Sequence, residues 1–163
     1  MKKLLKKRPP QDDAKKAFTL IEMLVVMTIL VVLVSLIVSV SKYVRNRADS
    51  EETKGTQAIL MNAINAFYEK KNDYPAETGT NFNARNNHLF IDLSAEVPGS
   101  LGDLPKDALQ GQFFYDGFGK VMDYRRFGGL GGGPVIISAG PDKDMKDDPN
   151  DKANDDNIRS DQQ

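Results

Sequence analysis

The sequence predicts an α+β protein, in which the outer half of one very long amino-terminal helix packs on a small antiparallel β-sheet. Three observations predict this fold. Residues 20–40 are apolar, with Glu22 as their single ionisable residue. No proline interrupts residues 11–74, and short β-branched segments rich in turn residues follow. A chain of 163 residues has room for one small domain beside a membrane helix.

Residues 18–40 are expected to form a transmembrane and assembly helix. The 21 residues from Leu20 to Val40 would extend about 32 Å, which is enough to cross a hydrocarbon core. Thr28, Ser35 and Ser39 are compatible with this environment, because their hydroxyls can bond back to the helix backbone.

The charge is asymmetric along the chain. Residues 1–17 form a basic leader with seven basic and two acidic residues, and the remainder carries a net charge of −6. The positive-inside rule then keeps the leader cytoplasmic and exports everything after Val40. This is not the charge balance of a nucleic-acid-binding protein. The chain has no cysteine, so an exported domain of this size needs another stabiliser, such as a metal or oligomer contacts.

Residues 41–71 are expected to continue the helix as an amphipathic spine of the soluble domain. The whole helix, residues 18–71, would then be about 80 Å long. Helical spacing groups apolar residues on one wide face: Ile59, Leu60, Ala63, Ile64, Ala66, Phe67 and Tyr68. The helix should stop before Pro75, because proline excludes helical geometry in the residue before it.

Residues 72–163 are expected to form a loop and β-sheet domain. Residues 76–103 are polar and predict a loop region with one short helix or strand. Val135–Ser138 is the clearest strand, and alternating apolar residues are expected to cover one face of the sheet: Phe114, Val121, Tyr124 and Phe127. His88 is the only histidine. With no nucleophile–base pair and no cofactor loop, the sequence predicts no enzymatic activity.

Glu22 is unusual, because a carboxylate inside a membrane costs a few kcal/mol unless it is near the interface, protonated or paired. One interpretation places it, solvated, at the membrane edge. In the other, a cut between Ala17 and Phe18 creates an α-amino group four residues before Glu22. A neighbouring copy shifted along the helix axis could pair that amine with the carboxylate, which would set the register of assembly.

The segment Lys-Ala-Phe-Thr-Leu-Ile-Glu-Met-Leu-Val-Val, residues 16–26, resembles the processing site of type IV pilins and of the pseudopilins of type II secretion systems. The resemblance implies that a prepilin peptidase cleaves before Phe18 and methylates the new amine, and that Glu22 guides subunit addition. Ala17 stands where the family normally has glycine. Alanine is also small, so cleavage is expected.

The carboxyl-terminal region is similar to the major pseudopilin. Leu104-Pro105-Lys106-Asp107 and residues 116–124 resemble its β-region. Residues 138–142 and the later Asp-Asp-Asn-Ile at 155–158 resemble its calcium loop. This implies Ca²⁺ ligands at one set of residues: Asp142, Asp155 or Asp156, the backbone carbonyl of Ala139, and Asp144 as a further candidate. Composition alone favours a solvated acidic tail, since eight Asp lie between residues 141 and 163. The segment lacks the glycine and closing glutamate of an EF-hand.

The resemblance implies a structural subunit that polymerises into a helical pseudopilus and drives type II protein secretion. Its expected location is the bacterial inner membrane, crossed once, with a periplasmic carboxyl-terminal domain. Expected partners are other copies of the chain, the prepilin peptidase, the inner-membrane assembly platform and other pseudopilins. Two alternatives stay open: a type IV pilin or minor pilin used for adhesion or DNA uptake, and a monomeric calcium-binding module on an uncleaved signal anchor.

Overall fold

A computed structural model describes residues 18–146 and 154–162 of the chain. The chain divides into two compact units, residues 1–40 and 41–163. Each unit is described by itself below.

The long helix expected from the sequence is present as α1, Leu20–Lys71. It contains a segment that is long and apolar enough to cross a membrane, judged by length and composition. The polar stretch around residue 50 does not interrupt it, and Gly55 is accommodated within it. In the second unit α1 buries one stripe of side chains: Thr53, Thr56, Gln57, Leu60, Ala63, Ile64 and Phe67.

A second helix, α2 (Phe82–Glu96), lies within residues 76–103, where the sequence predicted a loop region with one short helix or strand. Asn81 caps it, and the Asn81 side chain accepts a hydrogen bond of 3.0 Å from the backbone N–H of Ala84. Leu89 and Leu93, four residues apart, are fully buried. The sequence signal was weak because the first half of the helix is mostly polar, and its apolar residues do not form a clean helical stripe.

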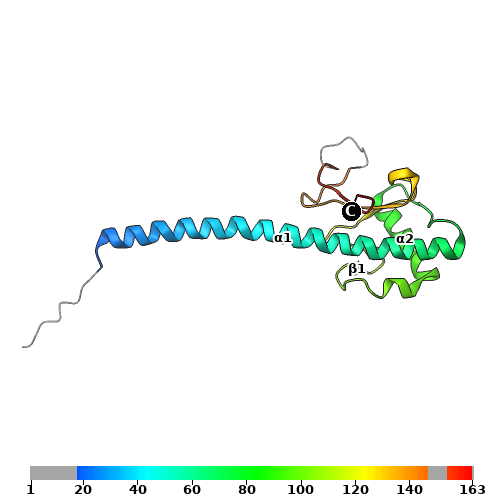
Figure 1. Ribbon diagram of the computed structural model, residues 1–163, viewed down its shortest axis with the longest axis horizontal. Coiled ribbons are helices and arrows are strands. Elements are labelled where there is room, and N and C mark those ends of the chain that lie inside the picture. Colours follow the sequence, from blue (N-terminus) through cyan, green and yellow to red (C-terminus); the bar gives the residue numbers. More distant parts are fainter. Residues whose placement is uncertain (1–17, 147–153, 163) are drawn as a thin grey trace, which may run out of the picture. The chain divides into compact units, whose positions relative to one another are not determined.

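Two antiparallel sheets complete the second unit, which confirms the α+β class (Figure 1). The strands are β1 (Leu109–Gln110), β2 (Phe113–Phe114), β3 (Asp123–Arg125), β4 (Val135–Ser138) and β5 (Ile158–Arg159). Strands β1 and β2 form one sheet, and the other has the order β3-β4-β5. Two 3₁₀ turns, η1 (Pro98–Leu101) and η2 (Leu130–Gly132), lie in the connections.

The hydrophobic core joins α1, α2 and both sheets. Its buried members are Leu60, Ala63, Ile64, Phe67, Leu89, Leu93, Phe114, Met122, Tyr124 and Ile136. Phe114 and Tyr124 were expected there. The expectation for Phe127 was wrong, because its side chain is 65% exposed. Phe127 follows the end of β3 in the turn towards β4, and the Arg126 guanidinium lies over its ring at 4.9 Å.

Two buried amides fasten the short strands to the helices. The Gln57 amide of α1 donates to the carbonyl oxygens of Ile136 (3.1 Å) and Ile158 (2.7 Å). The Asn86 amide of α2 donates to the carbonyl of Met122 at 2.8 Å, and its oxygen accepts from the N–H of Phe114 at 2.8 Å. Strands of two to four residues make few ladder bonds, so these side chains supply partners that buried backbone groups require.

Candidate functional site

The amino-terminal end of α1 is closed by a reciprocal pair of hydrogen bonds between Thr19 and Glu22. The Glu22 carboxylate oxygen Oε2 accepts from the Thr19 backbone N–H at 2.7 Å and from the Thr19 hydroxyl at 3.0 Å. In return, the Glu22 backbone N–H donates to the Thr19 hydroxyl oxygen at 3.3 Å. This is a capping box, in which both residues satisfy donors that the first helical turn leaves open.

The capping role of Glu22 was missed in the sequence analysis, although its signal is plain. A threonine followed three residues later by a glutamate, directly before an apolar run, is the signature of a capping box. Both hydrogen bonds that the Glu22 carboxylate accepts from Thr19 involve one oxygen, Oε2. The other oxygen, Oε1, makes no hydrogen bond within the part of the chain that the structure describes.

Of the two residues flanking the expected cleavage point, the structure describes one. Phe18 is 77% exposed and precedes the first residue of α1 by two positions. Ala17 lies outside the described residues. Phe18 and Glu22 therefore stand together at the beginning of the helix, as the sequence implies.

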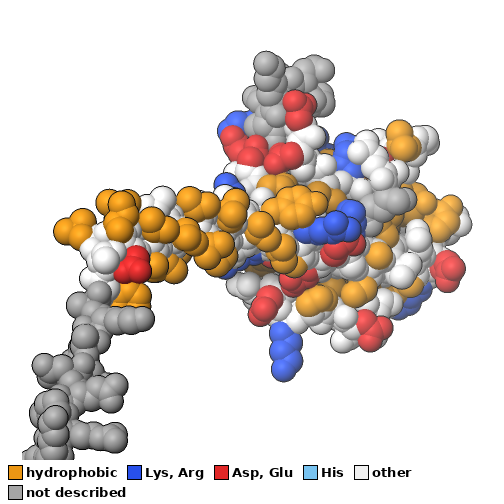
Figure 2. All heavy atoms as spheres, turned by 60° about the vertical axis from the view of Figure 1, so that its left-hand side comes forward, with side chains coloured by type: hydrophobic (Ala, Val, Ile, Leu, Met, Phe, Trp, Pro, Cys, Tyr) orange, Lys and Arg blue, Asp and Glu red, His pale blue; other side chains and the backbone are white. Residues whose placement is uncertain are grey.

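The first helical unit exposes nearly all of its large apolar side chains. Leu20, Ile21 and Val31 are 84%, 67% and 70% exposed, and hydrophobic side chains dominate the visible surface of this stretch (Figure 2). The two serines expected to bond back do so: Ser35 donates to the Val32 carbonyl at 2.7 Å, and Ser39 donates to the Ser35 carbonyl at 3.0 Å. Such a surface requires lipid or other protein around it.

The carboxyl-terminal loop brings Asp156 against Asp142. The Asp142 backbone N–H donates to Asp156 Oδ2 at 3.1 Å. Gly140 permits this approach, because a Cβ atom built on it would lie 2.3 Å from the Asp156 carbonyl oxygen. Asp155 is more exposed than Asp156. Of the two candidate carboxylates left open by the sequence, Asp156 is therefore the one seated beside Asp142.

The other candidate ligands have competing partners. Asp144 forms an ion pair of 2.7 Å with Lys146. The Asn157 amide nitrogen donates to Asn154 Oδ1 at 2.8 Å, and the same amide turned by 180° would donate to the Ala139 carbonyl oxygen at 3.2 Å. Among the described residues, no three His, Cys, Asp or Glu side chains gather as a metal site. Asp142 and Asp156 supply the hard oxygen donors that Ca²⁺ prefers, but only part of the six to eight it takes.

A buried aspartate, Asp116, accepts a hydrogen bond from Ser138, the last residue of β4. Asp116 Oδ2 accepts a 2.6 Å hydrogen bond from the Ser138 hydroxyl, whose oxygen accepts from the Gly140 N–H at 3.1 Å. Asp116 Oδ1 accepts from the N–H groups of Phe118 and Lys120. Burial raises the pKa of the Asp116 carboxyl, and these hydrogen bonds offset only part of that effect. Asp116 thus joins the turn after β2 to the beginning of the acidic loop.

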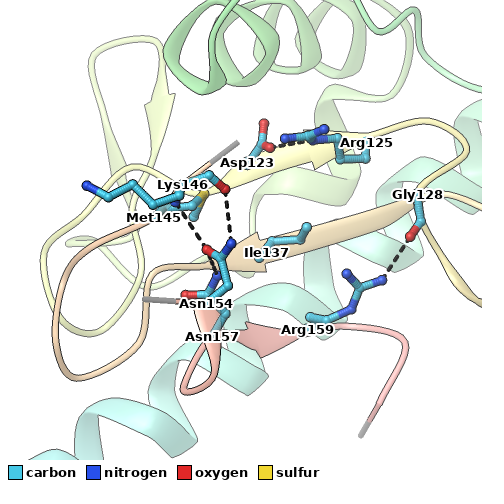
Figure 3. Close-up of a pocket in the computed structure, with 9 residues that line it drawn as sticks. All are labelled: Asp123, Arg125, Gly128, Ile137, Met145, Lys146, Asn154, Asn157 and Arg159. Atoms are coloured by element: carbon cyan, nitrogen blue, oxygen red, sulfur yellow. Dashed lines mark hydrogen bonds and ion pairs between the residues drawn. The ribbon is translucent and has the colours of Figure 1, made fainter. Parts of the chain in front are cut away.

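A hollow of about 370 Å³ lies over the sheet formed by β3, β4 and β5, and several charged side chains line it (Figure 3). Arg125 is paired with Asp123 at 2.7 Å, and Arg159 donates to the Gly128 carbonyl at 2.8 Å. Both of these cations therefore already have partners within the described residues.

A family model described as the prokaryotic N-terminal methylation motif matches residues 13–38. The match covers the basic end of the leader, the expected cleavage point and the apolar helix. Comparisons with curated proteins and with solved structures returned no match. The chain therefore carries a prepilin-type signal at the beginning of a helix that can cross a membrane.

Proposed function

We propose that this chain is a type IV pilin-like structural subunit that polymerises into a filament. The observation that carries the proposal is the methylation motif over residues 13–38, placed where a 52-residue helix begins with an exposed apolar stem. A prepilin peptidase cleaves between Ala17 and Phe18, and residues 18–40 then hold the subunit in the inner membrane. During assembly, neighbouring stems replace lipid around those side chains.

The capping box explains how Glu22 can serve its own helix and a neighbour together. Oε2 holds the Thr19 N–H and hydroxyl, which leaves Oε1 to accept from the methylated Phe18 amine of another copy. That contact joins different surfaces of the two copies, so it is heterologous, and it continues as an open helical filament when the rotation between copies does not close a ring.

Within this class, we favour the major pseudopilin of a type II secretion system. The support is the resemblance of residues 104–107, of residues 116–124 and of the acidic loop to that subunit. The role would be mechanical, as a growing pseudopilus anchored at the assembly platform, and we expect no enzymatic activity. A pilin or minor pilin for adhesion or DNA uptake is the alternative of the same class, and a monomeric signal-anchored module is the alternative outside it.

The proposal includes a Ca²⁺ site in the carboxyl-terminal loop. Asp142 and Asp156 would hold the ion, with the Ala139 carbonyl as a third donor. The contact between Asp142 and Asp156 supports this set. Bound Ca²⁺ would stabilise a cysteine-free domain, because the free energy of binding adds to that of folding.

The deciding experiment is the intact mass of the mature protein isolated from membranes, combined with electron microscopy of sheared surface or periplasmic material. We expect a chain that begins at methylated Phe18 and is found in filaments. A mature chain that keeps Met1 and stays monomeric in detergent would exclude the filament and leave the anchored module. Loss of secretion, with adhesion and DNA uptake unchanged, in a strain lacking the gene would separate a pseudopilin from a pilin.

A further inference from the structure

A shallow hollow of about 340 Å³ lies on α1 near the beginning of the second unit. Its lining residues are Tyr43, Asn46, Arg47, Ser50 and Glu51. Three of them carry hydrogen-bond donors, which are the Tyr43 hydroxyl, the Asn46 amide and the Arg47 guanidinium. None of these three side chains has a hydrogen-bond or ion-pair partner among the described residues. The hollow therefore offers unused donors to an acceptor from outside the chain.

The charge around the hollow favours an anionic acceptor. Residues 41–48 carry three basic residues and no acidic one. The other two cations, Lys42 and Arg45, are exposed, and their side chains have no partner in the part of the chain that the structure describes. Glu51 is the acid in the hollow, and it is paired with Lys54 at 3.3 Å. The unpaired charge here is therefore positive.

The three cations are spread around the helix and are not gathered on one face. At about 100° per residue, Lys42, Arg45 and Arg47 cover about 200° of the helix circumference. A partner protein contacts one face of such a helix, whereas lipid headgroups surround it. The apolar segment ends at Val40, two residues before Lys42. A bilayer spanned by residues 18–40 therefore has its headgroup layer at this part of the sequence.

We infer that the hollow binds the phosphate group of an anionic phospholipid while the subunit is in the membrane. This inference deepens the proposed function and rests on its placement of residues 18–40 in a bilayer. The Arg47 guanidinium, with the donors of Tyr43 and Asn46, holds the phosphate oxygens through charge-assisted hydrogen bonds. Lys42 and Arg45 attract the net negative charge of the headgroup, which a zwitterionic lipid lacks. The ligand class is thus a phospholipid such as phosphatidylglycerol.

The test measures which lipids stay bound to the full chain. The protein is reconstituted in nanodiscs that contain equal amounts of phosphatidylglycerol and phosphatidylcholine, and it is then released in mild detergent. Native mass spectrometry counts the retained lipids, and we expect an excess of phosphatidylglycerol. Arg47→Gln should lower the ratio of the two lipids about fivefold, the effect of one basic residue at an anionic surface. Replacing Lys42 and Arg45 by Gln as well should bring the two lipids to equal retention.

Lys106→Gln is the matched control. Lys106 is also an exposed cation of the second unit, and its side chain has no partner among the described residues. This variant should leave the lipid ratio unchanged. An equal fall in Lys106→Gln, or no fall in Arg47→Gln, would overturn the inference. Inorganic phosphate added at constant ionic strength should not displace phosphatidylglycerol, and displacement would show a site for the free ion instead.

Filament yield separates a lipid from a second copy of the chain as the occupant. Fewer filaments from Arg47→Gln, with lipid retention unchanged, would assign Arg47 to a contact between copies and refute the lipid site. Lipid retention is measured on the unassembled chain, so its failure leaves the proposed function standing. A chain that keeps Met1 and forms no filaments, yet retains phosphatidylglycerol in this way, would refute the filament and keep the headgroup site.

Discussion

The Arg85 guanidinium of α2 binds the Asp123 carboxylate of β3 through two hydrogen bonds, of 2.6 Å and 2.8 Å. Both side chains are buried, and Arg125 approaches the same carboxylate at 2.7 Å. This ion pair joins helix α2, whose length the sequence did not indicate, to the sheet that the sequence predicted.

Replacing Arg85 should destabilise the domain strongly. In Arg85→Met, the buried Asp123 carboxylate keeps Arg125 as its one charged partner among the described residues, so we expect the free energy of unfolding to fall by about 3 kcal/mol. Urea denaturation of the full chain in detergent, followed by near-UV circular dichroism, measures this change. Arg45→Met, on the exposed surface, is the control and should change stability by no more than about 0.5 kcal/mol. A loss below about 1 kcal/mol for Arg85→Met would contradict the prediction.

Two glycine substitutions should act in opposite directions. A Cβ atom at Gly117 would lie 2.2 Å from the Asp49 carbonyl oxygen of α1, whereas a Cβ atom at Gly55 meets nothing within 4 Å. Gly117→Ala should lower the free energy of unfolding by about 2 kcal/mol through overpacking. Gly55→Ala should raise it by about 1 kcal/mol through helix propensity. The same urea titration tests both, and a change of the same sign in the two variants would count against the close packing at Gly117.

Substitutions at Glu22 separate its charge from its capping role. Gln can replace Glu in a capping box, because its side-chain oxygen can still accept from the Thr19 N–H. If the charge binds a neighbour's amine, Glu22→Gln and Glu22→Ala should both abolish filaments while leaving membrane insertion intact. Electron microscopy and membrane fractionation measure the two effects. Ser35→Ala, which removes one back-bond of the stem, should assemble normally. Normal filaments from Glu22→Gln would reject the pairing.

Calcium should stabilise the domain through Asp142 and Asp156. Saturation at about one hundred times the dissociation constant adds about 2.7 kcal/mol, which corresponds to a rise in Tm of roughly 5–15 °C. Differential scanning calorimetry with Ca²⁺ and with a chelator measures the rise. Asp142→Asn and Asp156→Asn should remove it, and Asp155→Asn should retain it. The opposite result for Asp155 and Asp156 would assign the ligand to the other carboxylate.

Burial of Asp116 should leave a pH dependence on stability. Because its pKa is raised above the ordinary 3.8, the folded chain holds the proton more tightly than the unfolded chain does. Its contribution to stability is therefore greatest below pH 3.8 and is lost as the pH rises through the folded pKa. As the pH rises from 3.8 through the folded pKa of Asp116, the unaltered chain should therefore lose stability relative to the Asp116→Asn variant. Parallel pH profiles of the two chains would show that Asp116 does not titrate in this way.

The sequence predicted the parts of the fold that follow from long, uniform patterns. Hydrophobicity and the absence of proline predicted α1 to its last residue, and β-branched residues predicted β4. For residues 76–103 the sequence left one short helix or strand open, and it did not indicate a helix as long as α2, because the buried positions of α2 include Asn86 and Arg85, whose burial depends on strands elsewhere in the chain. No local pattern could have supplied those partners.

The candidate sites show the same division. Thr19 and Glu22 form a local motif that the sequence contains in full. The choice between Asp155 and Asp156 depends instead on how β5 returns beside β4 and on the close approach at Gly140. The exposure of Phe127 likewise depends on where β3 ends. The strand stops at Arg125, two residues before Phe127.

Two hydrogen bonds of Gln57 connect α1 directly to two strands of the sheet. The Gln57 amide of α1 donates to one carbonyl of β4 and to one carbonyl of β5, and the Gln57 side chain is fully buried. Tension applied along the helix, as extraction from a bilayer would apply it, reaches both strands at once. Under such tension, the second unit should therefore stay folded as one body, and its strands should not separate one after another.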